Sequence, residues 1–149
     1  MKIPEEILIY GQDILSSPGM LRGKELVHHG RTCRYRHSLN VAAVSLRLCR
    51  WLSIPARRRD MVRGALLHDY YLYDRRAERK KNHLRSHAQT AHANAAADFT
   101  LSPVEEDVIR HHMFPITPRP PRSREGIIVC VADKIATFGE LLGLKAFLR

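Results

Sequence analysis

Nine histidines occur among the 149 residues, and several lie in settings that suit metal binding. The doublet His68-Asp69 follows the apolar run Ala65-Leu66-Leu67, and the pair His111-His112 precedes a proline-rich segment. His37 lies near the start of a long amphipathic stretch. Imidazole nitrogens and carboxylate oxygens together bind zinc, manganese, iron, cobalt or nickel. We therefore expect a divalent transition metal as cofactor, although the pattern does not distinguish among these metals.

Asp133 supports this expectation because of its apolar surroundings. It follows the run Ile127-Ile128-Val129-Cys130-Val131-Ala132. A buried carboxylate is costly unless cationic partners or a metal receive its charge. Helical proteins build metal cavities from such side chains on facing helices. We expect these histidines and Asp133 to meet in the core.

Other catalytic classes lack their motifs in this chain. There is no G-x-S-x-G element for a serine nucleophile and no cysteine beside an evident base. The phosphate-binding pattern G-x-x-x-x-G-K-[ST] and the zinc motif H-E-x-x-H are also missing from the sequence. Metal-assisted chemistry remains the best-supported class.

The hydrophobic periodicity predicts an all-α fold, with no convincing strand, in one domain over residues 1–149. A capping box at Ser102-Pro103-Val104-Glu105 marks the start of one helix. A loop is expected at 70–86 because aromatic and then strongly basic residues follow one another there. Helices are expected at about 4–16, through 26–28 with an end at Gly30, at 34–52, from Pro55 to 68–69, at 88–99, from 102 to 111–113, and at 125–144.

The net charge of +10 comes mainly from three basic runs, at 57–59, 75–81 and 119–124. One interpretation is that they are solvated loops and helix faces. The other is a positive field that attracts a small phosphorylated substrate or a nucleic acid. Aromatic residues do not alternate with these runs as in single-strand binders, so a nucleic acid is possible but not favoured.

No apolar run reaches the ~18 residues that a membrane span needs, so no membrane partner is expected. The N-terminal segment is acidic and does not resemble a signal peptide. The three scattered cysteines, Cys33, Cys49 and Cys130, do not form a disulfide framework. These features predict a cytoplasmic protein.

The order His37, His68-Asp69, Asp133 resembles the H…HD…D signature of the HD superfamily. The local contexts Arg36-His37-Ser38-Leu39-Asn40, Ala65-Leu66-Leu67-His68-Asp69 and Val131-Ala132-Asp133-Lys134 carry the resemblance over about residues 30–140. It is nearest to the small stand-alone bacterial HD hydrolases. The resemblance implies a compact bundle of six or seven helices with a metal held in its core by His37, His68, Asp69 and Asp133. It also implies a phosphohydrolase that uses a metal-activated hydroxide on a phosphate ester or anhydride.

A two-metal branch of the superfamily uses additional histidines. Here it would place a second ion on His87, His111 and His112, with Asp69 bridging both ions. His83 and His92 compete with His87 for that position. One ion or two therefore remains open.

Catalytic roles are expected for Asp69 and for the cations Lys134 and Arg36, which could contact phosphate. Arg110 is a further candidate, and each cation could instead be a surface charge. The chain has Leu72 where many HD hydrolases have lysine, and Tyr70-Tyr71-Leu72 where the cyclic-dinucleotide branch has Gly-Tyr-Pro.

Two other classes of function remain. The chain could be a non-catalytic metal- or nucleotide-binding regulatory module, or, less favoured, an RNA-associated protein. A homodimer is possible. Tyr70, Tyr71 and Tyr73 could stack on a nucleobase, but packing around the doublet is favoured.

Overall fold

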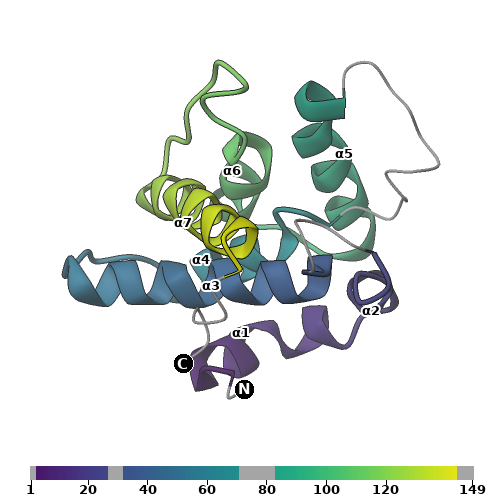
Figure 1. The fold of residues 1–149 in the computed structure, drawn as a ribbon, viewed down its shortest axis with the longest axis horizontal. Helices are drawn as coiled ribbons and strands as arrows, with labels where there is room; N and C mark the ends of the chain where they lie inside the picture. The colour runs from purple at the N-terminus through teal and green to yellow at the C-terminus, as the bar shows by residue number, and fades with distance from the viewer. Residues whose placement is uncertain (1–2, 27–31, 71–82, 144–149) are drawn as a thin grey trace.

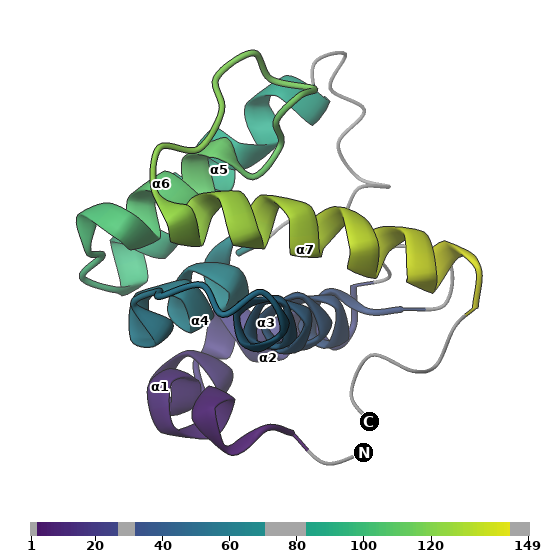
Figure 2. The same ribbon diagram turned by 90° about the vertical axis from the view of Figure 1, so that its left-hand side faces the viewer.

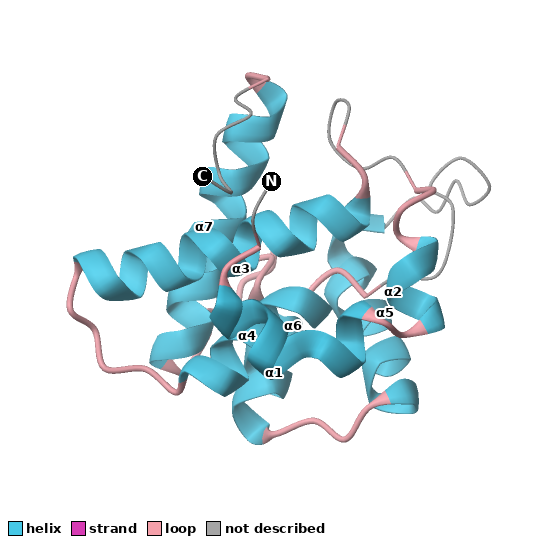
Figure 3. Ribbon diagram, turned by 90° about the horizontal axis from the view of Figure 1, so that it is seen from below, coloured by secondary structure: helices cyan, strands magenta, loops and turns pink. Residues whose placement is uncertain are grey.

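The computed structural model describes residues 3–26, 32–70 and 83–143, and the side chains of 83–85 lie outside the description. Those residues form seven helices and contain no extended strand, as Figure 3 shows. The all-α prediction is confirmed. The helices are α1 Glu5–Leu15, α2 Pro18–Arg22, α3 Arg34–Trp51, α4 Arg58–Leu67, α5 His83–Asp98, α6 Pro103–His111 and α7 Arg124–Leu141.

Helices α3 and α4 form the centre of the fold, and the others pack around them. In Figures 1 and 2, α1 and α2 lie on one side of α3, while α6 and α7 lie on the other. Helix α5 packs beside α6. Side chains fully buried between these layers include Ile14, Leu46, Leu66 and Ile109. This arrangement brings the inner faces of α3, α4, α6 and α7 together, and the histidines and aspartates lie there.

Local capping explains where several helices begin. The backbone N–H of Glu105 donates to Ser102 Oγ, and Glu105 Oε2 accepts from the Ser102 N–H, which confirms the predicted capping box. Ser123 caps α7 through the N–H of Gly126. These caps fix the first turns of α6 and α7, both of which carry site residues.

Two helix boundaries differ from the sequence prediction. Helix α4 begins at Arg58 instead of Pro55, because the Arg57 N–H donates to Glu125 Oε1 at 2.7 Å and ties that segment to α7. Helix α5 begins at His83, inside the expected loop 70–86. Residues 83–86 contain no glycine or proline, so nothing in them opposes extension of the alanine-rich helix. The rest of that loop lies outside the described residues.

The short helix α2 was not predicted. Ser17 caps it and Pro18 occupies its first turn. Glycine disfavours helices, so Gly19 argues against a helix in the sequence. A Cβ at this position would lie 1.9 Å from the Tyr70 hydroxyl, so the close packing requires glycine. The helix predicted through 26–28 falls largely on residues outside the description, as do His28 and His29.

Tyr70 packs in the core, as favoured above. It is 3% exposed, its hydroxyl donates to Asp98 Oδ2 at 2.8 Å, and its ring meets that of Phe99 edge to face. Tyr71 and Tyr73 lie outside the description. No helix among the described residues has the length and apolar character that a bilayer crossing requires.

Candidate metal centre

His68 follows the last turn of α4 and is fully buried. Its Nδ1 lies 2.7 Å from the carbonyl oxygen of Ala65. A carbonyl only accepts, so Nδ1 donates this hydrogen bond, and in the neutral ring Nε2 presents a lone pair. That Nε2 lies 3.3 Å from His37 Nε2 and 3.5 Å from Asp133 Oδ1. The end of α4 therefore directs His68 Nε2 toward α3 and α7.

His37, in the first turns of α3, lies between two carboxylates of α7. Its Nε2 is 3.1 Å from Asp133 Oδ1 and its Nδ1 is 3.0 Å from Glu140 Oε2. Glu140 also accepts from Asn40 Nδ2 at 2.7 Å. Asp133 and Glu140 are seven residues apart on one helix, so both can face α3. The imidazole is thereby held at both of its nitrogens.

The electrostatics of this group favour a cation. Burial by itself lowers the pKa of the His37 imidazolium, but the hydrogen bonds with Asp133 and Glu140 outweigh burial and raise the pKa to about 10. Burial also opposes ionisation of Asp133, yet His37 and His68 hold the pKa of that carboxyl well below its usual range. The carboxylates that hold a proton on the buried His37 ring would also attract a divalent cation that replaces this proton.

Asp69 belongs to a second group of donors with His87 and His112. His87 Nε2, on α5, contacts Asp69 Oδ1. His112, just past α6, points its Nε2 toward the same oxygen at 3.8 Å. Its Nδ1 donates to the carbonyl of Ile109 at 2.8 Å, so Nε2 again presents a lone pair. Asp69 thus lies between the group formed with His37 and His68 and this one.

The state of His112 provides a test of whether a metal fits. Its Nε2 is buried and has no hydrogen-bond partner within the described residues. Burial, reinforced by the nearby His68, lowers its pKa to about 3, so the ring is neutral at pH 7. Buried polar atoms normally have partners, and a neutral imidazole fixed by a backbone carbonyl is a typical metal ligand. The residues present fit a metal.

The spacing of the donor atoms agrees with that conclusion. Two ligands each ~2.1 Å from one ion, at angles of ~90–110°, lie roughly 3.0–3.4 Å apart. The two Nε2 atoms of His37 and His68 are 3.3 Å apart, and Asp133 Oδ1 is 3.1 and 3.5 Å from them. Three donors from three helices therefore converge on one point.

His111 is not brought to this cluster, contrary to the expectation that both members of the pair hold a metal. Its Nδ1 pairs with Asp107 Oδ1 at 2.8 Å, one turn back on α6. Consecutive residues of a helix point about 100° apart, so when His112 faces inward His111 faces outward. Of the rivals for the His87 position, His92 lies 3.6 Å from Glu106 instead. The side chain of His83 lies outside the description.

Of the cations expected to contact phosphate, Lys134 lies beside the cluster. Lys134 Nζ donates to the His112 carbonyl at 2.8 Å and is 3.8 Å from Asp133 Oδ2. It satisfies a carbonyl left open at the end of α6 and so joins α6 to α7. Arg36 and Arg110 are exposed. Their contact with phosphate, and that of Lys134, stays a prediction.

Glu140 and Asn40 were not predicted as site residues, yet Glu140 contacts His37 and Asn40 holds Glu140. Asn40 follows His37 by three residues and Glu140 follows Asp133 by seven. Each spacing returns a helix to nearly the same face. That signal could have identified them once His37 and Asp133 were paired.

Comparison with known proteins agrees with the fold. A search of curated proteins found no match. The family model described as HD domain matches residues 34–137, a span that contains α3 to α6 and most of α7. It includes His37, His68, Asp69, His87, His112 and Asp133. From this match, we conclude that the chain belongs to the HD-domain family.

Proposed function

We propose that this protein is a metal-dependent phosphohydrolase that cleaves a phosphate ester or anhydride in a small phosphorylated metabolite, such as a nucleotide. The observation that carries the proposal is the position of Asp69, which belongs to both donor groups. A carboxylate between two sets of imidazoles suits a two-ion centre, as in many phosphate-cleaving enzymes.

His37, His68, Asp69 and Asp133 would hold one ion, and Asp69, His87 and His112 the other. Divalent ions there would lower the pKa of coordinated water toward ~7 and neutralise charge on the phosphate. The protein contributes fixed donors, since backbone carbonyls orient His68 and His112 and Glu140 orients His37. The net charge of +10 attracts a phosphorylated substrate.

The test begins with elemental analysis of the purified protein. Phosphate release from phosphomonoesters, nucleotides and dinucleoside polyphosphates is then measured with added Mn²⁺, Co²⁺ or Ni²⁺. We expect His68→Ala and Asp69→Ala to lose bound metal and to reduce turnover at least 1000-fold. His92→Ala is the matched control, because it removes a histidine outside the cluster. Unchanged metal content and activity in both cluster variants would refute the proposal.

Other outcomes would favour the alternative functions. Tight metal binding without turnover of any phosphate compound would indicate a regulatory metal- or nucleotide-binding module. A salt-dependent gel shift with RNA, without hydrolysis of small phosphates, would indicate an RNA-associated protein.

A further inference from the structure

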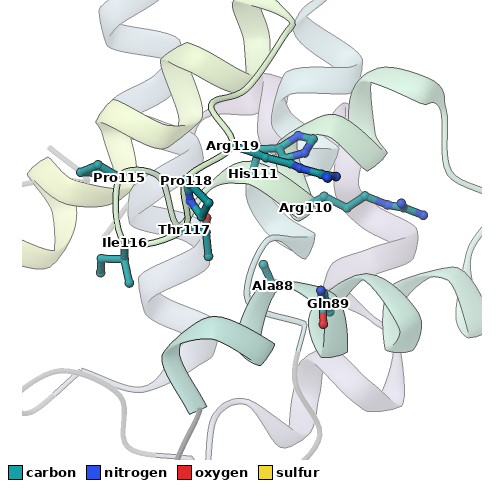
Figure 4. Close-up of a pocket in the computed structure, with 9 residues that line it drawn as sticks. All are labelled: Ala88, Gln89, Arg110, His111, Pro115, Ile116, Thr117, Pro118 and Arg119. Atoms are coloured by element: carbon teal, nitrogen blue, oxygen red, sulfur yellow. The ribbon is translucent and has the colours of Figure 1, made fainter.

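A cavity of about 640 Å³ lies between α5, α6 and the segment after α6, shown in Figure 4. Two of its lining residues are sequence neighbours of residues in the metal cluster. Ala88 follows His87, and His111 precedes His112. The cavity therefore adjoins the backbone that carries His87 and His112, on the side of α6 toward which His111 points. It is lined by Ala88, Gln89, Arg110, His111, Pro115, Ile116, Thr117, Pro118 and Arg119.

The polar part of this cavity is cationic. In Figure 4 the side chains of Arg110 and Arg119 extend toward the same side of the picture, and that of Arg119 passes beside the imidazole of His111. Neither guanidinium has an ion pair within residues 3–26, 32–70 and 83–143, and none of the lining residues is acidic. Exposed Arg58, by contrast, pairs with Glu6 at 2.7 Å. Two unpaired guanidiniums in one cavity are suited to bind an anion with several oxygens.

The remaining wall is apolar and its backbone is restrained. Pro115, Ile116 and Pro118 form much of that wall, with Thr117 and Gln89 as neutral hydrogen-bonding groups. Prolines fix φ in this segment, and the Thr117 N–H donates to the carbonyl of Met113 at 3.2 Å. The cavity lies within the size range of small-molecule sites, larger than one phosphate needs.

We propose that this cavity binds the further phosphate groups of the substrate through Arg110 and Arg119, so that the substrate is an organic phosphoanhydride with at least two phosphates. The inference rests on the proposed function and specifies its substrate class. In that hydrolysis a water oxygen bonds to the attacked phosphorus and the bridging P–O bond breaks. Its electron pair stays on the departing group, and the proton of the water is released to solvent.

The binding test uses metal-free protein in a chelator at 150 mM salt, with tripolyphosphate as the probe in calorimetry. We expect Arg110→Gln/Arg119→Gln to weaken binding at least 10-fold. Arg122→Gln is the matched control, because Arg122 is an exposed arginine of the same segment that does not line the cavity and uses its backbone N–H to contact Asp107. Equal weakening in the control would reveal only the general positive field and overturn the proposal, as would undetectable binding by the unmodified protein.

The hydrolysis test uses the Mn²⁺-loaded protein and two substrates, ATP and p-nitrophenyl phosphate. We expect the double variant to lose kcat/KM at least 10-fold more for ATP than for the monoester. Equal losses on both substrates would overturn the inference while the proposed phosphohydrolase stands. Arginine-dependent binding of tripolyphosphate without hydrolysis of any substrate would support the anion site and refute the proposed function.

Discussion

Oε2 of Glu140 lies 3.0 Å from Nδ1 of His37, at the opposite edge of the ring from the nitrogen that faces His68. A carboxylate behind a ligating histidine fixes the ring and raises the basicity of the ligating nitrogen. Glu140 is itself held by Asn40, at 2.7 Å. Glu140, near the end of α7, thus fixes the orientation of the His37 ring, near the start of α3.

Replacement of Glu140 by glutamine tests this relationship. The amide retains the shape but lacks the charge, so we expect metal affinity to fall about 10-fold or more. The measurement is competition with a chelating dye, and circular dichroism verifies the helical content. Glu106→Gln, a change at a partly exposed residue, should leave the affinity unchanged. Full affinity in Glu140→Gln would exclude the orienting role.

The neighbouring histidines His111 and His112 should behave differently. His112→Ala removes a buried nitrogen directed at Asp69, so metal content per protein should fall clearly. His111→Ala removes a ring that pairs with Asp107, so metal content should stay at the unmodified level. Elemental analysis of both variants decides the matter. Equal losses would restore the sequence-based expectation that both residues are ligands.

Lys134 distinguishes a structural contact from a phosphate contact. Its ammonium donates to the His112 carbonyl, so Lys134→Met should lower the free energy of unfolding by about 1 kcal/mol. Urea denaturation measures this change. If Lys134 also contacts phosphate, as its sequence position predicts, KM for the substrate rises in the same variant. An unchanged KM would leave it a positioning residue.

Stability should depend strongly on the buried ion pair between Arg63 and Glu105. Arg63 Nε lies 3.0 Å from Glu105 Oε1, and the two residues are 6% and 1% exposed. Glu105→Ala leaves the buried guanidinium without this partner and removes half of the capping box. We expect a loss of about 3 kcal/mol, measured by urea unfolding.

A matched change at the next residue provides the control. Glu106→Ala removes a carboxylate whose side chain is 43% exposed, and should cost less than about 0.5 kcal/mol. Similar losses in the two variants would show that the buried pair contributes nothing particular.

Much of the cluster could be predicted because its residues stand out locally. His68-Asp69 after an apolar run and Asp133 inside one are costly placements that need partners. Which of the adjacent histidines His111 and His112 points toward the cluster could not be predicted, because in the sequence the two are equivalent. That direction depends on the Ile109 carbonyl and the Asp107 side chain, which fix His112 and His111 respectively.

The fold was predictable where helices are long and capped, as in α3 and α6. Helix α2 was not, because Gly19 reads as a helix breaker until the neighbouring Tyr70 hydroxyl is known. The start of α4 was also missed, since a contact with Glu125, 68 residues away from Arg57, determines it. Contacts between distant segments are what single-sequence patterns omit.

Two residues that line the cavity are sequence neighbours of donors in the cluster: Ala88 follows His87, and His111 precedes His112. Residues 115–119 supply much of the wall but none of the grouped donors. Replacement of residues 115–119 by another loop should therefore change which ligand the cavity prefers without moving the donor nitrogens and oxygens. This short segment is the place to begin a redesign of ligand preference.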